Sequence, residues 1–308
     1  MKKQIISCCI AALAFAACED NFQPIPRPLA PAKRVSSPVV SAPVVAAAAF
    51  DAGKALAIEE PADALAIKHD QPGVDHLGRS KQLVEEGNRA GALTEARRAI
   101  FTDPNDEEAL TTIAGLSQKM GKHELAAEAF RRIAALRTDD AVPLVQQARA
   151  LVKARAFDRA ALVGKEAIKR DSGNPEAFQS AGLGYLGNGE LQNAIFMFSK
   201  VIELKPDHGW ALNNLGLAYL RANENEKAVE VLTQSAQVLP NVAYVHNNLG
   251  VALERVGRKD EAKQAYLTST TLSPKYVKAR INAERVAKVG TLDELDFDQQ
   301  APDTVPEN

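Results

Sequence analysis

The sequence predicts an all-α protein, a solenoid of short helix-turn-helix repeats that follows an N-terminal arm and ends in a capping helix. Two observations predict the repeat: Pro206, Pro240 and Pro274 are evenly spaced by about 34 residues, and the string "NNLG" at residues 213–216 returns after the same interval at residues 247–250. The third is composition. Ala, Leu, Glu, Lys and Arg dominate the second half of the chain, and aromatic residues make up only 5% of the whole, which favours helices over strands.

Residues 1–17 predict an export signal. Lys2 and Lys3 precede an apolar run at residues 5–17, which is shorter than the roughly 20 residues that a permanent bilayer span requires. All three cysteines lie within residues 1–18. The ending "FAAC" at residues 15–18 resembles a lipoprotein lipobox, which implies that Cys18 becomes the lipidated first residue of the mature chain. Phe15 departs from the preferred leucine, so an ordinary cut near "AFA" at residues 14–16 is the alternative.

Residues 18–72 read as a disordered, Pro/Ala-rich linker behind this anchor. Residues 21–72 hold eight of the chain's sixteen prolines. Because proline is excluded from helix interiors and central strands, we expect extended chain or coil here. Such a linker would hold a folded domain away from a membrane surface.

Six units follow, at residues 73–106, 107–140, 141–174, 175–208, 209–242 and 243–276. In the unit 209–242 the recurring residues are Leu212, Leu215, Gly216 and Tyr219, then Ala228, Leu232 and Pro240. Small residues at positions 8 and 20 of each unit allow two helices to approach closely, and large residues fill the neighbouring spaces. The pattern resembles the tetratricopeptide repeat, which implies a right-handed superhelix.

Two of the six units are degenerate. In the unit 73–106, Arg79 and Ser80 interrupt the first helix, and in the unit 141–174, Gln147 and Gly164 stand where apolar side chains are expected. Residues 277–290 have helical periodicity and predict the helix that caps the last repeat. Residues 291–308 predict a disordered acidic tail.

The motifs that could carry chemistry are weak. "GLGYLG" at residues 182–187 satisfies the dinucleotide-binding pattern, but no strand precedes it, so we expect these glycines to lie within a repeat helix. The five histidines show no zinc-ligand spacing, and no nucleophile or phosphate-binding motif is found. The sequence thus predicts a non-catalytic protein without cofactor or metal. A catalytic pair of carboxylates stays open because Asp and Glu are plentiful.

The "NNLG" strings divide into two faces of a helix. At about 100° per residue, the leucine and glycine fall on the core stripe and the two asparagines on the opposite side. In tetratricopeptide arrays the first helices line a concave groove, so the resemblance implies that this second face binds a partner. The predicted groove residues are Gln179, Ser180, Asn213, Asn214, Leu217, Arg221, Asn247, Asn248, Val251, Arg255, Asn282 and Arg285.

Position 6 of successive first helices is a polar ladder that ends in Asn214, Asn248 and Asn282. Asparagine offers two donors and an acceptor, so such a row can bind the backbone of an extended peptide whatever its sequence. The alternative is that these residues only bond to the neighbouring repeat. Arg221 and Arg255 favour an acidic or C-terminal carboxylate in the ligand, or else form part of a solvated surface.

Together these features predict an adaptor that binds a protein or extended peptide, anchored by lipid to a bacterial membrane, outer in preference to inner, with its repeats in the periplasm. A net charge of −2 gives no reason to expect a nucleic-acid partner, and no small-molecule substrate is expected. The layout resembles the lipoproteins that assemble type IV or tight-adherence (Flp) pili and their secretins. The alternatives are a general periplasmic scaffold, a regulatory subunit of a cell-wall enzyme, or an enzyme whose pocket would show converging groups with shifted pKa values.

Overall fold

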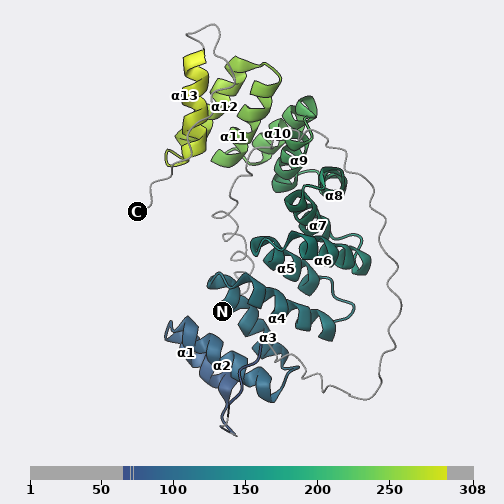
Figure 1. The fold of residues 1–308 in the computed structure, drawn as a ribbon, viewed down its shortest axis with the longest axis vertical. Coiled ribbons are helices and arrows are strands. Elements are labelled where there is room, and N and C mark those ends of the chain that lie inside the picture. The colour runs from purple at the N-terminus through teal and green to yellow at the C-terminus, as the bar shows by residue number, and fades with distance from the viewer. Residues whose placement is uncertain (1–64, 70, 72, 290–308) are drawn as a thin grey trace, which may run out of the picture. The chain divides into compact units, whose positions relative to one another are not determined.

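The computed structural model describes residues 65–69, 71 and 73–289, and within them it contains thirteen α-helices and no strand (Figure 1). The predicted all-α repeat solenoid is confirmed. The helices are α1 (His76–Glu85), α2 (Arg89–Thr102), α3 (Glu107–Lys119), α4 (His123–Leu136), α5 (Val142–Lys153), α6 (Phe157–Arg170), α7 (Pro175–Asn188), α8 (Leu191–Leu204), α9 (Gly209–Arg221), α10 (Asn225–Val238), α11 (Ala243–Arg255), α12 (Lys259–Leu272) and α13 (Val277–Val289).

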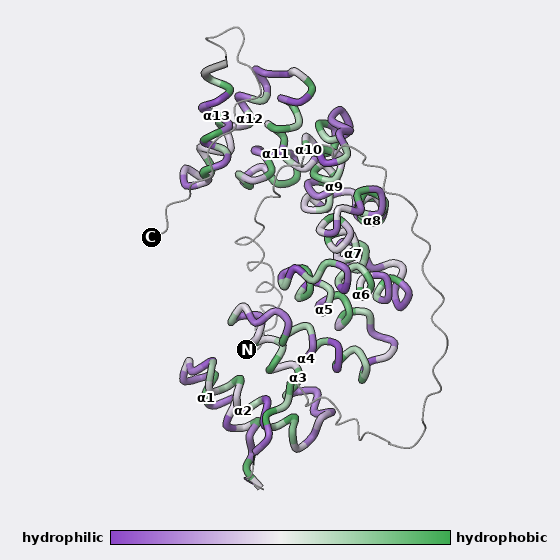
Figure 2. The backbone as a smooth tube through the Cα atoms, viewed as in Figure 1, coloured by the Kyte–Doolittle hydropathy of each residue, from purple (hydrophilic) through white to green (hydrophobic). Residues whose placement is uncertain are grey.

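Each of the six units holds two of these helices, and every helix packs against the next along the chain. Figure 2 shows hydrophobic and hydrophilic stretches alternating within the helices, as expected when one stripe of each helix is buried. The helix α13 packs on α12 and α11, at the place of the predicted cap, of which residue 290 lies outside the described part. None of the described helices combines the length and the hydrophobicity needed to cross a bilayer.

One residue with a positive φ angle ends the first helix of every unit. These residues are Gly87, Gly121, Arg155, Gly189, Asn223 and Gly257, which recur with the period of the repeat. The left-handed conformation lets the chain turn directly into the second helix, and glycine and asparagine adopt it most readily. Arg155 adopts it in the unit 141–174, so this unit keeps the turn of the others despite its unusual residues.

The residues that made two units look degenerate fit the packing. Ser80 is fully buried, and its hydroxyl donates to the carbonyl of Ala92 at 2.8 Å. Its small size suits position 8, where the second helix approaches. Gly164 lies against Ala181 of α7, where a Cβ atom would come within 2.7 Å of the Ala181 backbone. A larger side chain there would force α6 and α7 apart.

Residues 65–69 correct the predicted linker. The prediction of a disordered segment over residues 18–72 is wrong for these five residues, which we call the strap. Leu65 is fully buried in the core of the first two repeats, the N–H of Ile67 donates to the Arg97 carbonyl at 3.0 Å, and Arg97 Nε donates to the Leu65 carbonyl at 2.7 Å. Cys18, the predicted signal, most of the linker and the predicted tail lie outside the described residues.

The close contact of α6 and α7 gives the first prediction. A Cβ atom at Gly184 would lie 2.5 Å from the Ala161 backbone nitrogen. Although Gly to Ala within a helix ordinarily stabilises by up to ~1 kcal/mol, Gly184→Ala should lower the free energy of unfolding by about 1–3 kcal/mol. Denaturant unfolding followed by circular dichroism measures the change.

Gly115 in α3 is the matched control, because nothing lies within 4 Å of a Cβ atom there. Gly115→Ala should therefore stabilise by up to ~1 kcal/mol. If both substitutions stabilised the protein, the close approach of α6 and α7 would be refuted.

Candidate protein-binding surface

The predicted groove residues lie on the first helices of the repeats. The helices α5, α7, α9, α11 and α13 each lie next to the following one in this series, and we call them the first-helix row. Because the row is formed by equivalent faces of equivalent helices, each residue position of the repeat recurs once on every helix of the row. Contacts between neighbouring helices of the row are therefore contacts between successive repeats.

Four of the asparagines bond to one another across the repeats. Asn248 Nδ2 donates to Asn213 Oδ1 at 2.9 Å, which joins α11 to α9, and Asn282 Nδ2 donates to Asn247 Oδ1 at 3.0 Å, which joins α13 to α11. Asn213 is fully buried, and Asn247 and Asn248 are each 5% exposed. The role that the sequence left as the alternative, bonding to the neighbouring repeat, is the one that these contacts perform.

The chain of amides breaks between α7 and α9. Gln179 occupies the repeat position of Asn213 and Asn247. It is only 7% exposed, yet its buried Oε1 has no hydrogen-bond partner. Its expected partner by the repeat register is Asn214. Within the described chain, the side chain of Asn214 takes part in one hydrogen bond, a long one in which Asn213 Nδ2 donates to Asn214 Oδ1 at 3.4 Å.

This break leaves an acceptor and a donor without partners at neighbouring positions of the row. A buried carbonyl oxygen without a partner is uncommon because its desolvation costs about 1–3 kcal/mol. Ser180, next to Gln179, does not fill the gap, since its hydroxyl donates to the Glu176 carbonyl within α7 at 2.8 Å.

The two predicted carboxylate-binding arginines cap helices. Arg221 donates to the Leu186 carbonyl at 2.5 Å, and Arg255 donates to the Leu220 carbonyl at 2.6 Å. Each acceptor lies in the last turn of the preceding first helix, where carbonyls lack helical partners and the helix dipole favours a cation. Burial lowers the pKa of the Arg221 guanidinium. The ligand role predicted for these arginines stays a prediction.

The remaining predicted residues also contact the protein itself. Leu217 and Val251 are half-buried and pack against the core that α9–α12 share. Arg285 of α13 forms a two-pronged ion pair with Glu254 of α11, with Nη2 and Oε2 at 2.7 Å, and Tyr266 donates to the same carboxylate at 2.9 Å. The capping helix is therefore held by one cluster that joins it to α11 and α12.

Sequence reasoning missed a second polar group on the row. Glu176 of α7 pairs with Arg149 of α5, and His208 at the start of α9 lies 3.5 Å from its other oxygen. The hydrogen bond from His208 lowers the pKa of the Glu176 carboxyl most, and the charge of Arg149 adds to this effect. Spacing gives no simple signal for it, because Glu176 and His208 lie at the starts of α7 and α9 whereas Arg149 lies past the middle of α5.

The described residues contain no group of three histidine, cysteine, aspartate or glutamate side chains placed to hold a metal ion. The three glycines of "GLGYLG" lie inside α7, with Gly182 against the Phe198 ring and Gly187 against the Phe157 ring. They are packing positions.

Comparisons with known proteins agree with this geometry. The tetratricopeptide repeat family matches residues 185–247 and residues 243–276. Residues 185–276 of the chain therefore contain tetratricopeptide repeats. A comparison with curated protein sequences finds no match.

Among solved structures, the APC/C hetero-tetramer Cut9-Hcn1 matches with a TM-score of 0.54 and 19% identity. The match covers 68% of this chain and only 42% of that chain. YrrB, described as a TPR protein with an unusual peptide-binding site, matches with a TM-score of 0.48 and 16% identity over 62% of this chain and 97% of that one. MamA matches with a TM-score of 0.48 and 21% identity over 56% of this chain and 94% of that one. At these identities the likeness to Cut9-Hcn1 shows the fold alone.

The broken amide chain yields a prediction on stability. Asn248→Ala should lower the free energy of unfolding by about 1–3 kcal/mol, because it leaves the buried Oδ1 of Asn213 without a donor. Asn214→Ala is its matched control, since it removes the same side chain from the same repeat position and should cost less than about 1 kcal/mol. Urea unfolding measures both. Equal losses of unfolding free energy would show that the two asparagines stabilise the protein equally, which would contradict the break in the amide chain.

Proposed function

We propose that this protein is a non-catalytic adaptor that binds an extended segment of a protein partner on the first-helix row, where α7 meets α9. The observation that carries the proposal is the break in the amide chain, with an unsatisfied acceptor on Gln179 and an unused amide donor on Asn214. An extended peptide presents N–H and C=O groups in alternation, so its backbone can accept from Asn214 and, once the buried Gln179 side chain turns outward, donate to Gln179, without regard to the side chains of the peptide.

The charges beside this place support a polypeptide as the ligand. Glu176 of α7 and Arg149 of α5 form an ion pair, so together they add no net charge to this part of the row. A peptide whose charges are mixed fits such a surface better than a polyanion does. The tetratricopeptide repeats themselves agree with a role as a scaffold for protein binding.

Sequence features support the proposed place of action. Cys18 after an export signal supports a lipid anchor, and the proline-rich segment behind it supports repeats that work in the periplasm at a distance from the membrane, the outer membrane in preference to the inner. The partner would belong to an envelope complex such as a pilus or a secretin. Anchoring the adaptor to a membrane raises its effective concentration near such a complex.

Gln179→Leu separates binding from folding. It replaces an unsatisfied buried acceptor by an apolar group of similar length, so the free energy of unfolding should stay the same or rise by about 1 kcal/mol. Partner binding should fall at least fivefold, because the ligand N–H loses its acceptor. A photo-crosslinking amino acid at Leu217, on the same row, measures binding in intact cells.

The control for this experiment is the same photo-crosslinker at Phe196, which is 55% exposed on α8, a second helix. It should trap little of the protein that position 217 traps. If position 196 crosslinked a protein partner and position 217 crosslinked none, the proposed surface would be wrong. It would also be wrong if Gln179→Leu left the crosslinking yield at position 217 unchanged.

The anchor has its own test. Mass spectrometry of the mature protein should find Cys18 as an acylated first residue, and Cys18→Ser should move the protein from the membrane fraction to the soluble fraction. An acyl-free terminus at another residue would refute the lipid anchor and leave the binding surface untouched.

A further inference from the structure

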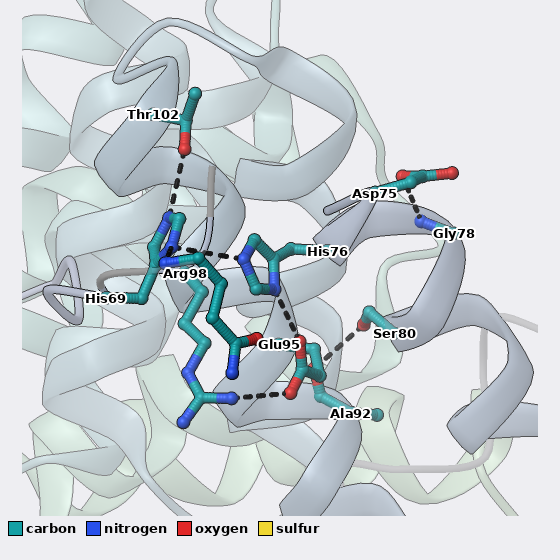
Figure 3. Close-up of polar contacts among 10 residues, drawn as sticks. His69, Asp75, His76, Gly78, Ser80, Ala92, Glu95, Arg98 and Thr102 are labelled. Carbon is teal, nitrogen blue, oxygen red and sulfur yellow. Dashed lines mark hydrogen bonds and ion pairs between the residues drawn. The ribbon is translucent and has the colours of Figure 1, made fainter. Parts of the chain in front are cut away.

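Two histidines that lie apart in the sequence meet where the strap contacts the first repeat (Figure 3). His76 is 3% exposed, and its Nδ1 lies 2.6 Å from Glu95 Oε2. Its Nε2 lies 3.2 Å from Nδ1 of His69 in the strap, and the two ring centroids are 4.2 Å apart. The far nitrogen of His69, Nε2, lies 3.0 Å from Thr102 Oγ1 of α2. A continuous hydrogen-bonded relay therefore joins the strap to α2 through His76 of α1.

One assignment of protons satisfies every contact of this relay. A carboxylate only accepts, so His76 Nδ1 carries a proton. The backbone N–H of Gln71 donates to His69 Nδ1 at 3.4 Å, so that nitrogen is bare and His76 Nε2 donates to it. His69 then carries its proton on Nε2 and donates to Thr102. We assign the closed arrangement to a cationic His76 beside an ionised Glu95, with a neutral His69.

A second proton does not fit. The bare Nδ1 is the only basic ring nitrogen left in the relay, and protonating it would place two N–H groups head to head at 3.2 Å. It would also place two cationic rings at 4.2 Å. The hydrogen bond that joins the strap to His76 would become a repulsion.

The surrounding charges add to this repulsion. Glu95 is already shared, since Arg98 Nη1 donates to its Oε1 at 2.7 Å. Arg79 of α1 contributes a further positive charge near Glu95, Arg97 of α2 is directed to the Leu65 carbonyl, and Lys68 of the strap is exposed. Among the described residues, the carboxylate of Asp75 accepts from the Gly78 N–H at the start of α1. These described contacts offer no carboxylate oxygen to a cationic His69.

Glu95 itself is not the titrating group in mild acid. Burial by itself raises the pKa of its carboxyl, but the hydrogen bond from His76 and the charge of Arg98 outweigh burial and leave the pKa below its ordinary value. A carboxyl with a lowered pKa contributes stability above its unfolded pKa of about 4.3 and loses it only as the pH falls through the lowered value. Any change between pH 7.5 and pH 5 must therefore come from another group.

We propose that residues 65–69 form an acid-sensitive latch, which is closed on α2 near neutral pH and is released when His69 takes up a proton. A released His69 is surrounded by water, where histidine binds a proton readily below about pH 6.5. The contact of His76 with Glu95 joins α1 to α2 and does not involve the strap, so the proton on His76 is counted in both states. The additional proton on His69 thus binds the open strap better than the closed one, and acid shifts the population toward the open strap. Opening removes Leu65 from the core and uncovers the apolar surface of the first two repeats.

The reporter is the amide of Ile67, because its N–H donates to the Arg97 carbonyl only while the strap is closed. Hydrogen exchange of the full chain, read by mass spectrometry on peptides that contain Ile67 and corrected for the intrinsic effect of pH, gives its protection factor. With an ordinary histidine pKa of about 6.5 for the open strap, this factor should fall about 10- to 30-fold from pH 7.5 to pH 5. Peptides from α9–α12 should keep their protection.

The variant His69→Gln tests the cause. Glutamine can accept from His76 and donate to Thr102 but does not titrate, so the ratio of protection factors between the two pH values should drop below threefold. If the glutamine failed to hold the strap, protection would be low at both pH values and the ratio would again be small. His246→Gln, at a histidine of α11 that bonds to the Pro240 carbonyl, is the matched control and should keep the full ratio.

Two results would overturn the latch. A wild-type ratio below threefold would show that acid does not release the strap. A 10- to 30-fold ratio that persists in His69→Gln would assign the effect to another group.

Discussion

Every repeat depends on the close approach of its two helices at one small residue. In the three C-terminal units this residue is Gly182, Gly216 or Gly250, and a Cβ atom on any of them would come within 2.4–2.6 Å of Phe198, Leu232 or Tyr266. These large side chains are buried because the glycine leaves room for them. Neither helix could bury its apolar stripe alone, so the period of the sequence is the period of this contact.

Polar side chains add a second kind of contact, which joins repeats to one another. Apolar packing sets how far apart two repeats lie, whereas the bonds of Asn248 to Asn213 and of Asn282 to Asn247 require one relative position of α9, α11 and α13. Arg221 and Arg255 strengthen the same junctions by capping the preceding helices. A surface built in this way offers a ligand only the polar groups that the contacts between repeats leave unpaired. The junction at Gln179 leaves such a group, whereas the asparagine bonds at the junctions beside it leave none of their acceptors unpaired.

The repeats were predictable because the same residues recur at a short, constant interval in several units of the sequence. The sequence predicted the individual partners poorly. Helical periodicity assigned the asparagines to a groove face opposite the core, but they are buried where repeats meet. Whether an amide faces a ligand or the next repeat depends on distances between helices of different repeats. The strap was assigned to the linker because the linker was predicted from its average composition. Five residues with one buried leucine hardly alter that average. His69, His76 and Glu95 gave no motif because the fold alone brings them together.

The two ends of the repeat array are closed by contacts of different chemistry. Stacked repeats leave an apolar face at each end, and some element must cover it. At the C-terminal end α13 is held by Arg285 and Glu254. Burial by itself raises the pKa of the Glu254 carboxyl, but the hydrogen bonds from Arg285 and Tyr266 outweigh burial and lower the pKa, so this contact persists until the pH falls through that lowered value. At the N-terminal end the cover is a short strap, and the side chains that hold it are imidazoles, whose ordinary pKa lies near neutrality. The proposed latch would therefore respond to mild acid at this end only, whereas the carboxylate of Glu254, held by Arg285 and Tyr266, resists it at the other.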